Sequence, residues 1–282
     1  MTAIADLSAI VNRLSGGNSG TPQHVFSFLS GRIQGAVPTA PVASTMHSLW
    51  RYDQSDGANG AIPGSAGVCN RSTIGALPVN NPGGGRQQWL LGIEGQLNAQ
   101  AVVILYDRLL HNGGLSGTVT SAQTVGGTLT RYSTNATCVG NQIWVEVYTA
   151  IGATATTITA SYTNQAGTAG RTTKPTAIGG AGKLAQSTII ILPLADGDTG
   201  VQAVASVTLA ATTGTAGSFG VTIAHPLTIG NCGGAALFFT RDLIAGLPAG
   251  QEMLTDACLT WAVVPANTTI PSGLLAAHII EV

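Results

Sequence analysis

The sequence predicts an all-β protein, an antiparallel β-sandwich for which a jelly roll is one candidate topology. Three observations support this fold class. After Gly85, apolar residues recur at alternate positions; the segments that carry them are rich in Val, Ile, Thr and aromatic residues; and glycine-rich turns separate them. Many short strands at such spacing, without helical patterns between them, are typical of sandwiches and barrels.

The N-terminal part of the chain has a different character. Apolar residues at helical spacing predict one short helix over residues 3–14. The following stretch, residues 16–85, is rich in Gly, Pro, Asn and Ser, yet it contains large apolar residues that need to be buried. We therefore expect residues 1–85 to form an extended arm that carries the helix and drapes over its own domain or a neighbouring subunit. Residues 86–282 then form the β-sandwich domain.

The strands of the β-sandwich domain are predicted from local alternation. In IWVEVYTAI, for example, Ile143, Val145 and Val147 alternate with polar or aromatic residues. The predicted strands, in chain order, are 87–95, 101–106, 127–132, 143–151, 156–163, 187–194, 201–210, 218–224, 235–240, 259–264 and 276–282. Residues 241–248, RDLIAGLP, are expected to form one helical turn or a short linker between late strands.

The charge content indicates an assembling protein. Only 8% of the residues are charged, against about 25% in ordinary soluble domains. The polar surface must consist of hydroxyl, amide and backbone groups, which lose water at lower cost than charges do. We therefore expect an obligate assembly, in which much of the surface contacts other subunits. Large aromatic residues dominate interface energies. The candidate interface anchors in the arm are Phe26, Phe28, Trp50 and Tyr52.

Composition also argues against several classes of partner. The formal net charge is -1 and the arginines are scattered, so no basic face is available to bind nucleic acid directly. No uninterrupted apolar stretch reaches the roughly 18 residues of a membrane-spanning helix. The N-terminus lacks the pattern of a signal peptide, because Asp6 and Arg13 interrupt its apolar residues. We expect a chain made in the cytoplasm, without a membrane partner.

The stretch YDRLLHNGG, residues 106–114, places Asp107, Arg108 and His111 close together in a chain that is poor in such groups. A catalytic triad would need Asp107 to orient His111 towards a serine, with Ser116 and Ser121 as candidates. No G-x-S-x-G sequence accompanies them. A structural corner, in which Asp107 binds Arg108 or backbone groups and fixes a loop, is the preferred interpretation.

Hydrolysis of a glycosidic bond requires two carboxyl groups about 5 to 9.5 Å apart. The chain offers few candidates, and no spacing in the sequence recommends any pair of them. These candidates are Glu94, Asp107, Glu146, Asp196 and Asp198. We therefore expect no enzymatic activity.

Metal and cofactor sites are not expected either. DGDTG, residues 196–200, resembles the start of a calcium loop but lacks its later acidic ligand, so a hairpin turn is preferred and calcium is the alternative. The histidines are dispersed, and no nucleotide-binding glycine loop is present. The four cysteines show no metal-ligand spacing, and we expect them to be buried free thiols. They are Cys69, Cys138, Cys232 and Cys258.

Three stretches resemble virion structural proteins of tailed bacteriophages, a family rich in Thr and Gly, and the likeness spans residues 86–282. The stretches are LYDRLLHNGGLSGTVTSAQTV, ASYTNQAGTAGRTT and GNCGGAALFFTRDLIAGLPAG. The resemblance implies a component of the particle. In character the chain is similar to capsid decoration or cement proteins, which commonly sit as trimers on the outer shell and clamp neighbouring capsomers. It does not resemble the shell subunit, whose long spine helix would leave a charged, helix-periodic stretch.

The expected function is therefore structural: a decoration or cement protein on the capsid surface of a bacteriophage. Such a protein would form a homotrimer, contact the major capsid protein and bridge capsid subunits. The alternative is a tail- or fibre-associated module that binds a host-surface glycan. Exposed aromatic residues paired on one face would favour the alternative, whereas buried ones would favour the structural role. The four tryptophans to consider are Trp50, Trp89, Trp144 and Trp261.

Overall fold

The computed structural model confirms the predicted all-β fold class, because the regular structure of the described residues consists of β-strands. The described residues are 23–29 (backbone), 42–51, 59–180, 182–234, 237–242, 251–269 and 271–281. The helix predicted over residues 3–14 and most of the turn predicted over 241–248 lie outside them. Within these ranges, no helix has the length and apolar character needed to cross a membrane.

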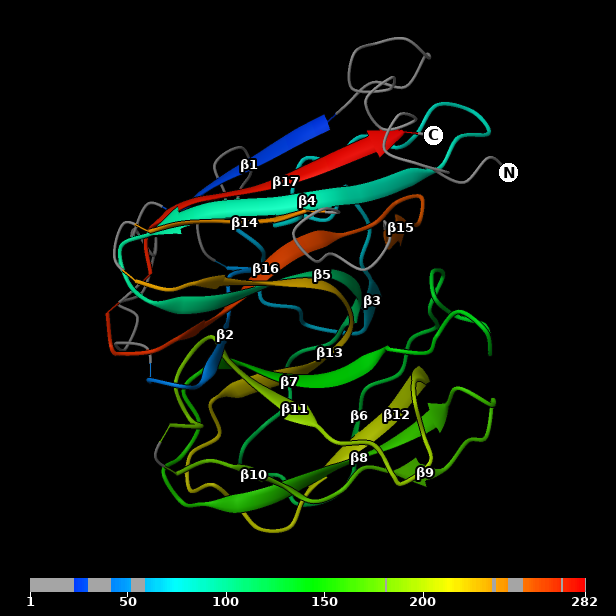
Figure 1. Ribbon diagram of the computed structural model, residues 1–282. Coiled ribbons are helices and arrows are strands. Elements are labelled where there is room, and N and C mark those ends of the chain that lie inside the picture. The colour runs from blue at the N-terminus through cyan, green and yellow to red at the C-terminus, as the bar shows by residue number, and fades with distance from the viewer. Residues whose placement is uncertain are drawn as a thin grey trace, which may run out of the picture.

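The strands form three antiparallel sheets stacked along one axis of the molecule (Figure 1). The sheet at one end, here called the β4 sheet, has the order β1-β17-β4-β14, and β15 also pairs with β4. Its strands are β1 (Gln23–Leu29), β17 (Gly273–Glu281), β4 (Gln88–Leu97), β14 (Phe238–Asp242) and β15 (Gln251–Met253).

The middle sheet closes on itself and is called the barrel. Its order is β13-β7-β11-β2-β16-β5, and β5 pairs again with β13, which completes a ring. Its strands are β13 (Ser218–Cys232), β7 (Gln142–Thr149), β11 (Thr188–Leu192), β2 (Met46–Ser48), β16 (Leu259–Pro265) and β5 (Ala101–His111). The short strand β3 (Gly67–Val68) pairs with the far end of β5.

The third sheet, the β8 sheet, lies at the opposite end of the molecule (Figure 1). Its order is β10-β8-β12-β6, and β9 also pairs with β8. Its strands are β10 (Thr176–Ile178), β8 (Thr156–Asn164), β12 (Val201–Leu209), β6 (Gln123–Thr124) and β9 (Arg171–Thr172).

Strand β13 closes the barrel because it is long and bent. Its first part pairs with β7, and its later part pairs with β5. The register against β5 shifts between Ile223 and Ala224 and again between Pro226 and Thr228. Such irregularities bend a strand and increase its twist, which a small closed sheet requires. Pro226, which has no N–H to donate, lies at one of these shifts.

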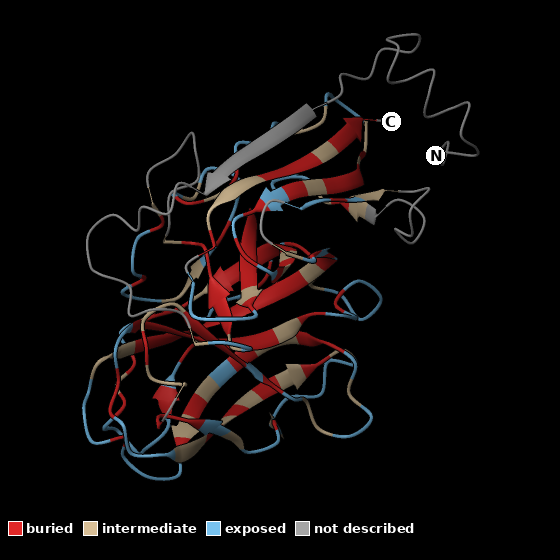
Figure 2. Ribbon diagram, turned by 60° about the vertical axis from the view of Figure 1, so that its left-hand side comes forward, coloured by how far each residue is buried: buried red, intermediate tan, exposed pale blue. Residues whose placement is uncertain are grey.

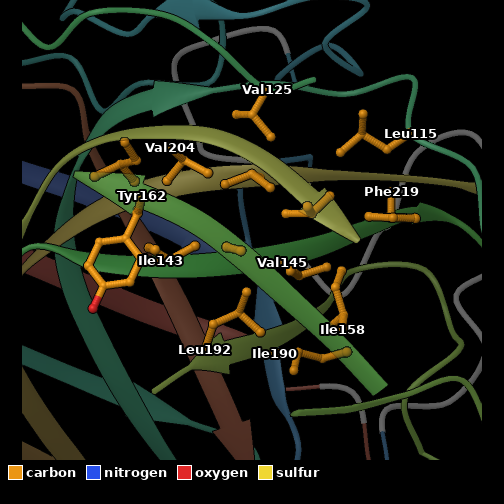
Figure 3. Close-up of a cluster of buried hydrophobic side chains, with 14 of the residues drawn as sticks. Leu115, Val125, Ile143, Val145, Ile158, Tyr162, Ile190, Leu192, Val204 and Phe219 are labelled. Carbon is orange, nitrogen blue, oxygen red and sulfur yellow. The ribbon is translucent and has the colours of Figure 1, made fainter. Parts of the chain in front are cut away.

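Alternation along the barrel strands produces two apolar cores and a separate interior. One core packs the barrel against the β4 sheet and includes Ile93, Leu105 and Trp261. The other packs it against the β8 sheet, where side chains from both sheets point towards a common centre (Figure 3). The buried residues accordingly predominate along the strands of the barrel, and they alternate with less buried residues along β8 (Figure 2).

The two-sheet sandwich predicted from the sequence differs from this arrangement of a closed barrel between two sheets. Local alternation predicts strands but does not show which strands pair. The segment before Gly85 contributes β1, β2 and β3, which pair with strands from the rest of the chain. Residues 127–132, predicted as a strand, have no regular structure.

Candidate functional site

Strand β5 carries the Asp107, Arg108 and His111 of the stretch that stands out in the sequence. Neighbouring residues of a strand point to opposite sides, and here Arg108 points into the barrel while Asp107 points out of it. Both residues are 0% exposed. Because burying a charge is costly unless it is paired and hydrogen-bonded, each must have a partner.

The partner of Arg108 is Glu146, which projects into the barrel from β7. The Arg108 Nη1 atom lies 2.7 Å from Glu146 Oε2, and Nη2 donates to the hydroxyl of Tyr148 at 3.0 Å. The hydroxyls of Tyr148 and Thr222 each donate to Glu146 Oε2 at 3.3 Å. The guanidinium carbon lies 4.5 Å from the centre of the Trp50 ring, a cation–π contact. The barrel thus encloses a hydrogen-bonded charge pair.

The electrostatics keep this network in one protonation state. Burial alone would lower the pKa of Arg108, but the charge of Glu146, together with Tyr148, Tyr106 and Cys69, outweighs it, and the pKa lies well above its ordinary value. Burial raises the pKa of Tyr106 and Tyr148, which line the same interior. The arginine therefore stays charged and the phenols stay neutral, and neither is prepared to exchange protons near neutral pH.

Asp107 binds a different cation on the outside of the barrel. Its carboxylate accepts two hydrogen bonds from Arg131, at 2.9 Å from Nε and 2.7 Å from Nη2. The backbone N–H of Cys258 donates to the same carboxylate at 2.8 Å. Bidentate pairs of this kind are strong and have a specific geometry. Asp107 therefore ties β5 to the loop that contains Arg131 and to the residue that precedes β16.

His111 does not complete a catalytic triad with Asp107. Its Nδ1 accepts a hydrogen bond from Arg108 Nε at 3.2 Å, and its ring meets the Trp50 ring edge-on at 5.7 Å. The Ser116 hydroxyl is bonded to Thr118 at 2.9 Å. The geometry favours the structural interpretation of this stretch, although the partner of Asp107 is Arg131, which the sequence did not single out.

The other carboxylates considered for hydrolysis are also held by basic side chains. Each of the five candidates lies within ion-pair distance of a basic residue of this chain. The pairs are Glu94–His278, Asp107–Arg131, Glu146–Arg108, Asp196–Lys174 and Asp198–Arg171. These acidic groups serve contacts between strands and turns.

The DGDTG turn connects β11 to β12 and uses its carboxylates in the same way. Asp198 accepts hydrogen bonds from Arg171 at 2.8 Å and Asn164 at 2.7 Å, and from the hydroxyl of Tyr162. Burial would raise the pKa of Asp198, but these donors outweigh it and lower the pKa to about 2. A shallow cavity of ≈ 380 Å³ lies beside the turn. Among the described residues, no group of three or more His, Cys, Asp or Glu could hold a metal ion.

The four interface anchors predicted in the N-terminal arm do not lie together in the structure. Phe26 and Phe28 lie on β1, opposite Ala276 and Leu274 of β17. Tyr52 lies outside the described residues. Trp50 is 0% exposed and packs inside its own chain, so the structure offers no exposed face of its ring to a neighbouring subunit.

The remaining tryptophans do not form an exposed platform. Trp144 and Trp261 are buried, and Trp89 is partly buried. The indole N–H of Trp144 donates to Gln142 Oε1 at 2.8 Å. Trp144 lies in the barrel interior beside Tyr106, and Trp261 lies in the core next to the β4 sheet. These aromatic rings contribute to packing.

His225 is buried between an aromatic ring and an amide. It stacks on Tyr132 at 3.9 Å, and its Nδ1 lies 2.9 Å from Asn141 Oδ1. Because Asn141 uses its amide N–H groups to bind carbonyls of Tyr132 and Val201, His225 Nδ1 donates to its oxygen. Burial lowers the pKa of His225, although the charge of Asp107 partly opposes this.

We expect stability to fall as the pH is lowered through the ordinary histidine pKa of about 6.5. The unfolded chain then takes up protons that the folded chain excludes, so the loss continues until the lower folded-state pKa is reached. His47, whose pKa burial also lowers, adds to the effect. Thermal melts between pH 7.5 and 5 would measure it. A His225→Gln variant should show a smaller change in Tm over this range than the parent protein, and an equal change would contradict this account.

The comparisons with known proteins find no family model that matches the chain and no curated protein that matches it. Among solved structures, derived T=1 particles of a mutant VP2 protein of infectious bursal disease virus show 9% identity and a TM-score of 0.21, over 93% of this chain and 77% of that one. The Gt strain of the same virus gives 9% identity and a TM-score of 0.19, over 94% of this chain and 81% of that one. These TM-scores are too low to establish a shared fold. The function of this chain must therefore be inferred from its own structure.

Proposed function

We propose that this chain is a non-enzymatic structural component of a bacteriophage particle, a decoration or cement protein that bridges capsid subunits at the capsid surface. One observation carries the proposal: most of the groups that a catalytic or glycan-binding site would expose are engaged in contacts within the fold. The carboxylates are paired with cations, and three of the four tryptophans are buried. The buried tryptophans favour this role over a glycan-binding tail or fibre module.

The β4 sheet supplies the surface for assembly in this proposal. Its edge strands are β1 and β14, and within the described residues no strand pairs with their outer edges. All neighbouring strands of this sheet are antiparallel, so β1 and β14 run in opposite directions. The β14 edge of one copy can therefore continue an antiparallel sheet with the β1 edge of the next copy. Head-to-tail contacts of this kind close into a ring when the rotation between copies is a whole fraction of a turn, and otherwise form open filaments. We propose that the ring closes as a homotrimer.

The β14 edge also exposes large apolar side chains. Phe238 is 60% exposed and Leu237 is 57% exposed. Ile229, at the end of β13, is 46% exposed, and its carbonyl accepts a hydrogen bond from Arg241 on β14. Exposed apolar residues on an unpaired strand edge mark a site for association with another chain. Phe26 and Phe28 lie on β1, at the other edge of the same sheet.

Replacing Phe238 with glutamate is expected to shift the protein from a trimer to a monomer, because the charge would have to lose its water on association. Light scattering after size-exclusion chromatography measures the mass of each species. Ile74→Glu is the matched control, since Ile74 is 58% exposed and does not belong to the β4 sheet. The proposed contact through the β14 edge is wrong if the Phe238→Glu variant has the same mass in solution as the parent protein. It is also wrong if Ile74→Glu dissociates the trimer to the same extent.

The proposed function itself is tested on particles. Purified protein is mixed with empty capsid shells of the phage that encodes it, shells that lack this protein, and the mixture is sedimented. The proposal expects the protein to sediment with the shells in a fixed ratio and to raise the temperature at which they break. Protein that stays in the supernatant, or that sediments only with isolated tails, would contradict a capsid role and favour the tail-associated alternative.

A further inference from the structure

Two cysteines from distant parts of the sequence meet at one edge of β5. The strands β3 and β16 lie end to end along this edge, and a cysteine stands at the end of each. The N–H of Cys69, just after β3, donates to the carbonyl of Leu109 at 3.1 Å, whereas the carbonyl of Cys258, just before β16, accepts from the N–H of Arg108 at 2.8 Å. Cys69 and Cys258 are therefore bonded to consecutive residues of β5.

The two cysteines belong to one small cluster that is shielded from water. Both residues are 0% exposed and share a small apolar cluster with Trp50. Each thiol shifts the pKa of the other through a side-chain hydrogen bond. The other two cysteines do not contact a second cysteine in this way. The thiol of Cys138 faces the carbonyls of Asn135 and Gln165, and the thiol of Cys232 faces those of Gly234 and Leu237. All four are free thiols in this structure.

The surroundings favour a thiolate at Cys69. Burial would raise the pKa of Cys69, but hydrogen bonds from Cys258 and His111 and the charge of Arg108 outweigh it, so that the pKa lies well below its ordinary value. Burial and the neighbouring Cys69 raise the pKa of Cys258, which keeps its proton. A thiolate beside a thiol is the arrangement from which disulfide exchange proceeds.

We propose that Cys69 and Cys258 form a disulfide bond when the folded protein meets a thiol-oxidising environment, and that this bond fastens the end of β3 and the start of β16 to one another. The circumstance in which this oxidation would occur in nature rests on the proposed function. A particle protein is made in a reducing cytoplasm and released into oxidising surroundings by lysis, where disulfides persist. The chemistry of the pair does not depend on that function.

The oxidant in this proposal is a low-molecular-weight disulfide such as oxidised glutathione. The Cys69 thiolate attacks one sulfur of the oxidant, and one glutathione thiolate leaves. The Cys258 thiol then loses its proton and attacks the Cys69 sulfur of the mixed disulfide, and the second glutathione leaves. The two cysteines together lose two electrons and the one proton of Cys258, and one glutathione disulfide becomes one glutathione thiol and one glutathione thiolate, which takes a proton from water. Access requires β3 to open, and β3 pairs with β5 over only two residues, Gly67 and Val68.

The bond would stabilise the protein mainly by restricting the unfolded chain. It would close a loop that contains most of the β-domain, and the stabilisation by a cross-link grows with the length of its loop. For a chain of this size we expect the Tm to rise by roughly 5 °C on oxidation.

The test begins with fully reduced, folded protein that is freed of reductant and incubated with oxidised glutathione. Remaining thiols are then blocked with N-ethylmaleimide, and the products are identified by intact mass and by mapping of proteolytic peptides. The proposal expects a species that has lost two thiols, with a peptide that links Cys69 to Cys258, and a raised Tm that returns to the original value on reduction. Diamide, a smaller oxidant, checks that slow entry of glutathione does not limit the reaction.

Variants separate this pair from the other cysteines. A Cys138→Ala, Cys232→Ala double variant is expected to oxidise and gain stability as the parent does, whereas Cys69→Ala and Cys258→Ala gain nothing. The mapping needs only the parent protein, so a variant that fails to fold does not decide the outcome. Links that involve Cys138 or Cys232, or no link in protein that remains folded under both oxidants, would overturn the proposal. Failure of the capsid sedimentation experiment would leave the mapped bond unaffected.

Discussion

Replacing Arg108 with methionine is expected to lower the free energy of unfolding by about 3 to 5 kcal/mol, because it leaves a buried charge without its partner. Methionine fills much of the same space, so the loss reflects mainly electrostatics. Glu146 would remain in the barrel with only the hydroxyls of Tyr148 and Thr222 as donors. Urea denaturation followed by circular dichroism would measure the change. Arg71→Met is the matched control, because the Arg71–Asp256 pair is exposed by 39% and 53% and such pairs contribute about 0 to 1 kcal/mol.

The second half of this experiment removes both charges. An Arg108→Met, Glu146→Leu double variant is expected to recover most of the stability lost by Arg108→Met alone, since apolar residues of similar volume can replace a buried ion pair at little cost. The barrel interior already contains the apolar residues Met46, Trp144 and Ile189, against which the introduced methionine and leucine side chains could pack. A strong coupling between the two sites in this cycle would identify the pair as one energetic unit. If Arg108→Met costs no more than Arg71→Met, the pair is not buried as described.

Local alternation in the sequence predicted most of the long strands. It did not predict that the middle sheet closes into a barrel. The segment 143–151 became β7 because its apolar residues face one core at every second position. The segment 218–224 identified only the start of β13, since Pro226 and Gly230 interrupt the pattern where the strand bends from β7 towards β5. The three-residue strand β2 is too short to show periodicity, yet it completes the ring.

The buried charge network could be predicted only in part. The sequence marked Asp107, Arg108 and His111 because charged residues are rare in this chain, and rarity is visible without a structure. Their partners were not identified, because Glu146 and Arg131 approach β5 through the ring closure and through a loop that was predicted to be a strand. One signal was available: Arg108 and Glu146 each lie within a strand of mostly apolar and aromatic residues, so each needs a buried partner of opposite charge.

A chain that begins at Arg86 is expected not to fold cooperatively, although the sequence predicted residues 86–282 as a domain of its own. This truncation removes β2, which is the connection between β11 and β16 in the barrel. It also removes Trp50, and loss of one fully buried tryptophan side chain costs about 3 to 5 kcal/mol. The total stability of a protein domain is about 5 to 15 kcal/mol, so the combined loss of β2, Trp50 and β3 should exceed it. Near-ultraviolet circular dichroism and thermal melts would show the absence of fixed packing.

Two further chains make this result specific. A chain that begins at Gln23 keeps every described strand and is expected to melt cooperatively. Co-expression of residues 1–85 as a separate fragment with the Arg86 chain should restore a folded complex, because β2 contributes through pairing with β11 and β16 and not through its connection to β4. A cooperative melt of the Arg86 chain alone would instead mean that the barrel can close without β2. The segment before Gly85 would then be an accessory arm, and its strands would be available for contacts between subunits.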